Sequence, residues 1–262
     1  MSTIPIKAQS LGRQSALSFD RTDIFGVRVH CVNKPQLLEQ VRSWVSAEGK
    51  RTVLYVNAHC LNISYRDPEH RAVLNQADLV YADGAGVVLA SRLLGGCTLQ
   101  KLTGRYWISD FCSVAAAEGL RLYFLAGQPG VAQRAGEALR CKWPALQIVG
   151  ANNGFFSSHN EEEILADIAA AKPHVLFVGM NTPRQEKWIA AHRAEIDVPV
   201  CWAVGALFDF VAGLEPPVPG WMNALNLEWF WRLLMDPRGK WRRYLFGNPL
   251  FLYRLLQQRK AA

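Results

Sequence analysis

The sequence predicts an α/β fold: a Rossmann-like parallel sheet with helices on both faces, followed by a C-terminal helical appendage. Four apolar runs of strand length, LRLYFLAG, LQIVGA, HVLFVGM and VPVCWAVGA, alternate with segments of helical periodicity. Strands that are apolar on both sides are buried on both sides, which is typical of a parallel sheet covered by helices. After these runs, the Pro- and Gly-rich segment GLEPPVPGW separates a tail of different composition from the rest of the chain.

The N-terminal half supplies the first strands and helices. Residues 24–32 are predicted to form a short strand, and the residues after Asn33 an amphipathic helix with Pro35 in its first turn. TVLYVNAH is the next strand, and helical spacing from 62 to 77 follows, with Asp67-Pro68 as an internal cap. DLVYADG is a brief strand that stops at Asp83-Gly84, and GVVLASRLLG is helical by its spacing.

In the C-terminal half, helical patterns at 131–142, 161–171 and 184–196 separate the four apolar runs. We therefore expect a Rossmann-like catalytic body at 21–215 and a basic, aromatic-rich appendage at 216–262. Residues 1–20 show no such pattern and are expected to be disordered.

The composition of the 262 residues, half apolar and 19% charged, is that of a globular protein. It excludes a disordered chain, a collagen-like fibre and a disulfide-rich miniprotein. The six cysteines are scattered, without a C-x-x-C pair or a matching histidine cluster, so neither a zinc site nor a disulfide framework is predicted. With no apolar run of about 18 residues and no signal-peptide core, these features favour a cytoplasmic protein.

The positive charge is concentrated in the tail. From Trp221 onward there are eight basic and two acidic residues, whereas the preceding 220 residues carry 21 basic and 20 acidic ones. The tail also holds four of the nine tryptophans. Cations mixed with aromatic side chains favour an anionic membrane surface, so we expect peripheral association with the inner face of the cell membrane. A solvated helix face, tryptophans in a core, and a nucleic-acid patch are the alternatives. The last is the weakest, because apolar blocks such as NPLFLYRLL need burial in protein or lipid.

Candidate ligand-binding residues follow the strand ends, because ligands of open parallel sheets bind beyond the carboxyl ends of the strands. An aspartate there is either a helix cap or a general base. The G-x-G-x-x-G fingerprint, the P-loop and the G-x-S-x-G elbow are all absent, which argues against NAD chemistry, ATP hydrolysis and an α/β-hydrolase. The strand-end residues are Asn57, Asp83, Gly127, Gly179 and Gly205.

Five blocks in one order resemble the WecG/TagA/CpsF family of bacterial glycosyltransferases. They are NQADLVYADGAGVVLASRLLGG, KLTG, YFLAGQPGVAQRAGEAL, VGMNTPRQEKWI and LEWFWRLLMDPRGKWRRY. The resemblance implies inverting transfer of a sugar from a UDP-sugar to a polyprenyl-diphosphate-linked saccharide, with no metal and no other cofactor. The metal-binding D-x-D motif is absent from this sequence, in agreement with that implication.

The resemblance also implies roles for individual residues. Asp83 is the general base, and Asn57 orients substrate hydroxyls unless it only forms an Asx-turn. Phe155 stacks on uracil, although a core position is the alternative and Phe156 could replace it. Gln185 and Glu186 serve the donor from the start of a helix, or lie in a solvated first turn. Asp209 binds uridine, and Gly127 and Gly179 let the donor approach the backbone.

The diphosphate then needs cations from the protein, because no metal is implied. Arginine binds phosphate oxygens bidentately. Arg232 and Arg242 are the first candidates, followed by Arg243 and Arg238, while Lys101 either meets a phosphate or is solvated. We hypothesise that the appendage folds over the cleft when its aromatic and basic face meets lipid.

Three positions depart from the family pattern. Tyr55 replaces a common threonine, Pro217 an arginine, and Gly239 another arginine for which Arg238 or Lys240 would stand in. The donor is left open. The exopolysaccharide branch and a hexose such as glucose are favoured, with N-acetylmannosamine or its uronic acid as the alternative. A non-catalytic nucleotide-sugar or lipid-binding regulator is the alternative of another class, and a homo-oligomer is left open.

Overall fold

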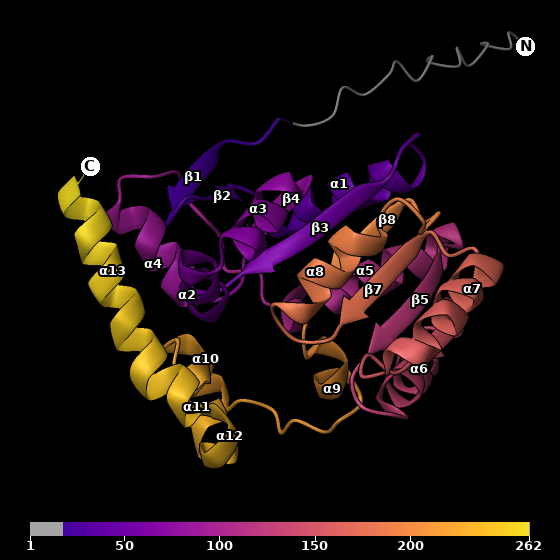
Figure 1. Ribbon diagram of the computed structural model, residues 1–262. Helices are drawn as coiled ribbons and strands as arrows, with labels where there is room; N and C mark the ends of the chain where they lie inside the picture. Colours follow the sequence, from indigo (N-terminus) through magenta and orange to yellow (C-terminus); the bar gives the residue numbers. More distant parts are fainter. Residues whose placement is uncertain (1–17, 262) are drawn as a thin grey trace, which may run out of the picture.

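A computed structural model describes residues 18–261 of the protein (Figure 1). Its centre is a six-stranded parallel sheet in the order β4-β3-β8-β7-β5-β6, which confirms the predicted fold class. The order places the carboxyl ends of β4, β3 and β8 next to one another, although β8 is far from the other two in sequence. The strands are β3 (Arg51–Val56), β4 (Leu79–Ala82), β5 (Arg121–Ala126), β6 (Gln147–Asn152), β7 (Val175–Gly179) and β8 (Val200–Ala203).

Helices cover both faces of this sheet because its strands carry apolar side chains on both sides. Every residue of β4, β7 and β8 is buried. One face packs against α1 (Lys34–Val45), α5 (Gly104–Glu118), α6 (Val131–Lys142) and α9 (Leu207–Val211). The other packs against α2 (Ala58–Arg66), α3 (Pro68–Gln76), α4 (Ala85–Leu93), α7 (Glu161–Ala171) and α8 (Arg184–His192).

The expectation of one strand at 24–32 is wrong. The chain forms an antiparallel hairpin there, of β1 (Arg21–Ile24) and β2 (Val27–His30). Phe25 and Gly26 both take positive φ angles, 58° and 77°, and this left-handed turn reverses the chain between two segments of only four residues. The disorder expected for residues 1–20 falls largely on residues 1–17, which lie outside the described part of the chain.

One pair of the scattered cysteines is brought together, although no disulfide framework is predicted from the sequence. The structure joins Cys31, just after β2, to Cys97, in the loop after α4, with Cα atoms 6.2 Å apart. The two residues are 66 positions apart in the chain, and no spacing rule pairs them. The other four cysteines are free.

The segment after α9 crosses the carboxyl edge of the sheet, at the bottom of Figure 1, and leads into the C-terminal helices. These are α10 (Gly220–Ala224), α11 (Glu228–Met235), α12 (Pro237–Trp241), the π-helix η2 (Arg242–Phe246) and α13 (Gly247–Ala261). We call residues 216–261 the appendage. Within residues 18–261, no helix has both the length and the apolarity needed to cross a bilayer.

Helix α13 fixes the appendage to the body through α2. Asn62 Nδ2 donates to the Gly247 carbonyl at 2.7 Å, and Arg254 Nη1 donates to Asn62 Oδ1 at 2.8 Å. Phe251 and Leu255 are buried in the same core cluster as the α2 residues. The appendage therefore lies against the carboxyl edge of the sheet.

Candidate active site

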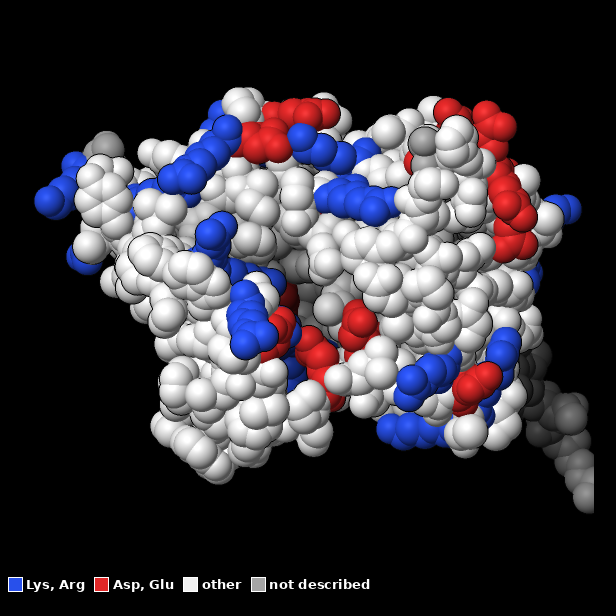
Figure 2. All heavy atoms as spheres, turned by 60° about the horizontal axis from the view of Figure 1, so that its bottom comes forward, with Lys and Arg blue, Asp and Glu red and all other residues white. Residues whose placement is uncertain are grey.

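A cavity of about 850 Å³ lies between the carboxyl ends of β3, β4 and β8 and the appendage. Figure 2, which brings this edge forward, shows the hollow with acidic and basic side chains gathered around it. The strand ends contribute Tyr55, Asn57, Tyr81, Asp83 and Val204, and the appendage contributes Arg232, Asp236, Lys240, Arg242, Arg243 and Phe246. A cavity at the strand ends, beside the basic appendage, is the arrangement expected from the sequence.

Asp83 follows β4 and presents a half-buried carboxylate to this cavity. Its backbone N–H donates to the Val56 carbonyl at 2.8 Å, which ties it to the neighbouring strand. The N-cap of α4 is Gly84, with φ at 102° and no side-chain capping bond. Among the described residues, the Asp83 carboxylate accepts one hydrogen bond, from Asn57 Nδ2 at 3.4 Å. Asp83 is therefore not a helix cap, and its carboxylate faces open space.

Asn57 forms the Asx-turn and also faces the site, because its amide oxygen and its amide nitrogen have different partners. Oδ1 accepts from the backbone N–H groups of His59 at 3.0 Å and Cys60 at 3.1 Å, which caps α2. The cap fixes the side chain so that Nδ2 is directed to Asp83.

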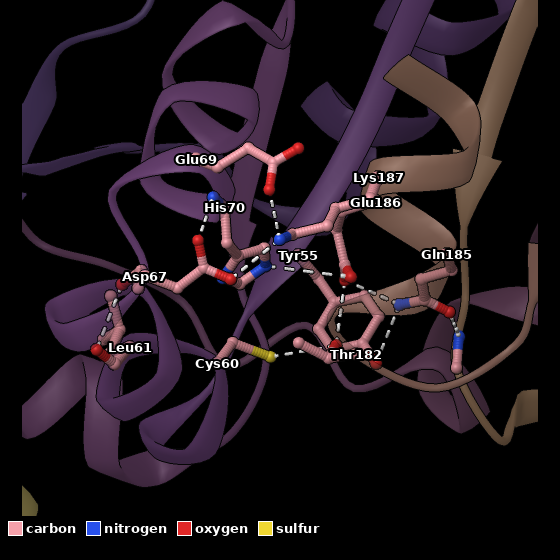
Figure 3. A network of polar contacts seen from close by, with 12 residues as sticks. Tyr55, Cys60, Leu61, Asp67, Glu69, His70, Thr182, Gln185, Glu186 and Lys187 are labelled. Atoms are coloured by element: carbon pink, nitrogen blue, oxygen red, sulfur yellow. Dashed lines mark hydrogen bonds and ion pairs between the residues drawn. The ribbon is translucent and has the colours of Figure 1, made fainter. Parts of the chain in front are cut away.

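Gln185 and Glu186 lie behind the cavity and do not line it. Both are fully buried, so the alternative of a solvated first turn is wrong. Gln185 Nε2 lies 3.3 Å from Tyr55 Oη, and its Oε1 accepts from the Gly205 N–H at 3.0 Å (Figure 3). Burial raises the pKa of Tyr55 well above its usual value, and Cys60, Glu186 and Asp83 raise it further, so the phenol stays protonated. Gln185 thus connects a cavity-lining side chain to the end of β8.

The other residues expected to bind the donor are not in the lining. Phe155 is half-buried after β6, with the Arg184 guanidinium 5.7 Å from its ring centre. Asp209 is half-buried on α9, where burial and the nearby Glu215 raise its pKa, while its neighbours Leu207 and Phe210 line the cavity.

Gly127 and Gly179 do not line the cavity, and protein fills the side-chain direction of each. A Cβ on Gly179 would lie 2.5 Å from the Gly205 carbonyl oxygen, and one on Gly127 2.6 Å from the Val131 side chain. Gly127 has a φ of 68°, a conformation that side chains other than glycine rarely adopt. These glycines permit close packing at the ends of β5, β7 and β8, and they lie outside the cavity in which the donor is expected.

The cations divide into those that face the cavity and those that do not. Arg232, Arg242 and Arg243 line it, whereas Arg238 is exposed and outside the lining, with Lys240 in its place. Burial lowers the pKa of Arg232, but Glu215, Tyr244, Asp83 and Glu228 together outweigh this and raise it, so Arg232 is charged. Its Nη2 lies 3.7 Å from Glu215 Oε2, and Lys240 Nζ lies 3.3 Å from Glu215 Oε1.

Lys101 is neither solvated nor in the lining. Its Nζ donates to Glu228 Oε1 at 2.8 Å and to Asn226 Oδ1 at 3.1 Å, and the ion pair is mostly buried. Tyr106 Oη also donates to Glu228 Oε1, at 2.8 Å. Burial raises the pKa of Glu228, but the bonds from Lys101 and Tyr106 outweigh it and lower the pKa below its usual value. Lys101 therefore fixes the start of α11, the helix that carries Arg232.

Sequence reasoning missed several residues of the lining. Arg105, at the start of α5, stacks over the Phe210 ring at 5.2 Å, and Arg66 and His59 lie on α2. Burial, Arg243 and His70 lower the pKa of His59 to about 4, so it is neutral near neutral pH. Arg105 comes directly after the KLTG block, and that adjacency was the signal available for it.

The appendage exposes most of the large apolar side chains found on the described surface. Twelve of these fifteen side chains belong to it, and they include Trp221, Trp229 and Trp241, whereas Tyr244 and Phe251 of the appendage are buried. Trp221 and Phe246 are the most exposed of the aromatic ones, at 63% and 65%. The twelve are Trp221, Leu225, Trp229, Phe230, Leu234, Met235, Trp241, Leu245, Phe246, Leu252, Tyr253 and Leu256.

Comparison with protein families matches residues 22–262 to the glycosyl transferase WecG/TagA/CpsF family. The chain belongs to this family. Two relatives from Staphylococcus aureus, strains MW2 and NCTC 8325 / PS 47, are each 27% identical over 245 residues, 92% of this chain and 94% of the relative. Both are named N-acetylglucosaminyldiphosphoundecaprenol N-acetyl-beta-D-mannosaminyltransferase. As a WecG/TagA/CpsF protein, the chain is a glycosyltransferase, and the alternative of a non-catalytic regulator loses its support.

Proposed function

We propose that this glycosyltransferase moves a sugar from a UDP-sugar to a polyprenyl-diphosphate-linked saccharide, with inversion and without a metal ion. The observation that carries the proposal is the position of the Asp83 carboxylate. It does not cap a helix, and it faces a cavity of about 850 Å³ whose lining includes arginines of the appendage. The carboxylate can take the proton that the acceptor hydroxyl loses. The cations can stabilise the negative charge that develops on the leaving diphosphate.

The reaction is a single displacement. Asp83 accepts the proton of an acceptor hydroxyl while that oxygen forms a bond to the anomeric carbon. The bond from the anomeric carbon to the UDP oxygen breaks on the opposite face, and its electron pair leaves with UDP. Arg232, Arg242 and Arg243 stabilise the negative charge that develops on the diphosphate. Asn57 orients the Asp83 carboxylate through the hydrogen bond from Nδ2.

The names of the relatives favour N-acetylmannosamine as the sugar over the glucose first expected. We therefore propose UDP-N-acetylmannosamine as the donor and a polyprenyl-diphosphate N-acetylglucosamine as the acceptor. UDP-glucose and the UDP-linked uronic acid of N-acetylmannosamine are the competing donors. Incubating the enzyme with each donor and a short-chain acceptor, and reading the product by mass, tests this order. Transfer of glucose alone would overturn it.

We also propose that the enzyme works at the inner face of the cell membrane as a peripheral protein. The exposed apolar side chains of the appendage and its excess of basic residues support this proposal. We propose no nucleic-acid partner, and no oligomeric state is proposed.

Asp83→Asn tests the catalytic assignment. The amide cannot accept the hydroxyl proton, so we expect kcat to fall by about 10²–10⁴-fold, while binding of UDP changes little. Asp110→Asn is the matched control, because Asp110 lies on α5 and pairs with Lys34 at the surface. Unchanged turnover in the Asp83 variant would contradict the proposal.

A further inference from the structure

The buried polar network behind the cavity has a carboxyl group at its centre (Figure 3). Glu186 Oε1 accepts hydrogen bonds from Thr182 Oγ1 at 2.9 Å and from Gln185 Nε2 at 2.8 Å. Both donors lead to the cavity. Thr182 lines it directly and contacts the cavity-lining Cys60 Sγ at 3.4 Å, and Gln185 reaches Tyr55 Oη.

The second oxygen of the same carboxyl group faces His70 on α3. Glu186 Oε2 lies 3.7 Å from His70 Nε2, and both side chains are fully buried. Glu186 Oε2 and both ring nitrogens of His70 have no hydrogen-bond partner among the described residues. A carboxylic O–H on Oε2, directed at a neutral ring nitrogen, would give Oε2 and Nε2 their missing partner.

An ion pair between these two groups is the less favourable state. Burial raises the pKa of Glu186 to about 7, against the hydrogen bonds from Gln185 and Thr182, which lower it. Burial lowers the pKa of His70 to about 4. Between these values the carboxyl group keeps its proton and the imidazole is neutral. The pair is therefore an uncharged acid that faces an uncharged base.

No cation replaces that proton. Lys187 is the neighbour of Glu186 in sequence, but its Nζ points away and pairs with Asp67 at 2.9 Å and with Glu69. The other titratable groups that face Glu186 are Cys60 of α2 and Tyr55 of β3. Burial raises the pKa of both, so they too are uncharged near neutral pH.

We propose that Glu186 is a positioning residue for sugar transfer: as a neutral acid that faces His70, it holds Thr182 and Gln185, and through them Tyr55, in place beside Asp83. The proposal rests on the proposed function, because it concerns the same cavity. Glu186 has no contact with the cavity itself, so its effect passes through the two side chains that bond to Oε1. Ionisation of Glu186 places an uncompensated negative charge on its two carboxyl oxygens and removes the proton that faces His70. We expect this charge to disturb Thr182 and Gln185, and with them the cavity wall.

Glu186→Gln separates this role from a merely structural one. The glutamine Oε1 can accept from Thr182 and Gln185 while its N–H donates to His70, so the variant copies the neutral acid at every pH. We expect the wild-type kcat to fall roughly tenfold between pH 7 and pH 8.5 and the variant to lack this fall. At pH 6.5 the two should agree within about twofold. Glu163→Gln, the same change at an exposed position of α7, is the matched control and should keep the wild-type profile.

Two readouts do not depend on turnover. An infrared band of a buried protonated carboxyl group should be present in the wild type near pH 6 and absent from Glu186→Gln. The folded wild type keeps a proton on Glu186 between pH 4.5 and about 7 that the unfolded chain releases, so this contribution to stability is lost as pH rises through that window. The unfolding temperature of the variant, relative to wild type, should therefore rise from pH 4.5 to pH 7 and stay constant above.

These outcomes distinguish the two proposals. If Asp83→Asn keeps its turnover, the proposed function fails. If the variant at Glu186 shows the same alkaline fall as wild type, or the infrared band is absent near pH 6, the positioning role fails while the proposed function stands. Loss of activity in Glu186→Gln at pH 6.5, with an unchanged unfolding temperature, would also overturn it, because the neutral isostere should support transfer.

Discussion

Asn57 shows how one side chain serves both the fold and the site. Its carbonyl oxygen caps α2, and its amide nitrogen reaches the carboxylate of Asp83. Loss of an N-cap costs about 1 kcal/mol, which explains part of the need for a polar residue at the end of β3. A side chain whose acceptor and donor are separate atoms fits the two demands, and asparagine is the shortest such side chain.

Asn57→Asp is the substitution that separates the two demands. The aspartate keeps the capping oxygen, so we expect the unfolding temperature to change little. It also removes the donor to Asp83 and places a second carboxylate beside it, and like charges at this distance favour uptake of a proton by one of them. The acidic limb of the pH–rate profile should therefore move to higher pH. Asn57→Ala is the contrasting variant, since it should lose about 1 kcal/mol of stability. An unshifted acidic limb would contradict the contact.

At the residue scale, the sequence located the strand-end positions but not their environments. Asp83 and Asn57 were predictable because the carboxyl ends of parallel strands meet at one edge of the sheet. The burial of Gln185 and Glu186 was not predictable, because polar residues in the first turn of a helix are usually solvated. Only the packing of α8 against α3 and the end of β8 removes them from water.

At the scale of elements, the close approach of β7 and β8 depends on glycine. Gly179→Ala would bring a Cβ within 2.5 Å of the Gly205 carbonyl oxygen and 2.8 Å of Ala126 Cβ. Neither neighbour is a flexible side chain, so a strand has to shift, and we expect a loss of about 1–3 kcal/mol of stability. Urea unfolding measures this loss. Gly220→Ala, at the start of α10 with open space around its Cα, is the control and should be nearly neutral.

The elements that sequence reasoning placed best are those with one strong pattern. The helices at 131–142 and 161–171 were predicted with the bounds that the structure has. Helix α5 was not assigned, although its buried residues Trp107, Ile108, Phe111, Cys112 and Ala115 follow helical spacing. The sequence pattern predicts one strand where the hairpin lies, because the turn begins with phenylalanine, which is not a typical turn residue.

At the scale of the whole molecule, charge and exposed apolar surface gather on the same part of the chain. The sequence predicted this segregation, because composition alone shows it. It could not show which cations turn toward the cavity, since Arg238 and Lys240 are two residues apart and lie in different environments.

Trp221→Ser combined with Phe246→Ser tests the proposed membrane surface. Each large apolar side chain contributes at most about 1.5–3 kcal/mol when it is fully buried, so the pair should weaken binding to anionic vesicles by about tenfold or more. Leu89→Ser is the control, since Leu89 is exposed on α4 of the body. Co-sedimentation at low and high salt measures the effect, and binding should weaken with salt because basic residues contribute. Equal retention of all three proteins would count against this surface.

The carboxylate of Glu215 already occupies two of the cations that a diphosphate would use, Arg232 and Lys240. An incoming diphosphate has to displace the Glu215 carboxylate from Arg232 and Lys240. Its binding free energy is therefore the difference between the ion pairs it forms and those that Glu215 loses. If the diphosphate of UDP binds these cations as proposed, Glu215 can return to both of them as the nucleotide leaves. The segment between α9 and α10 thus carries a tethered counter-ion, which offsets part of the positive charge of Arg232 and Lys240.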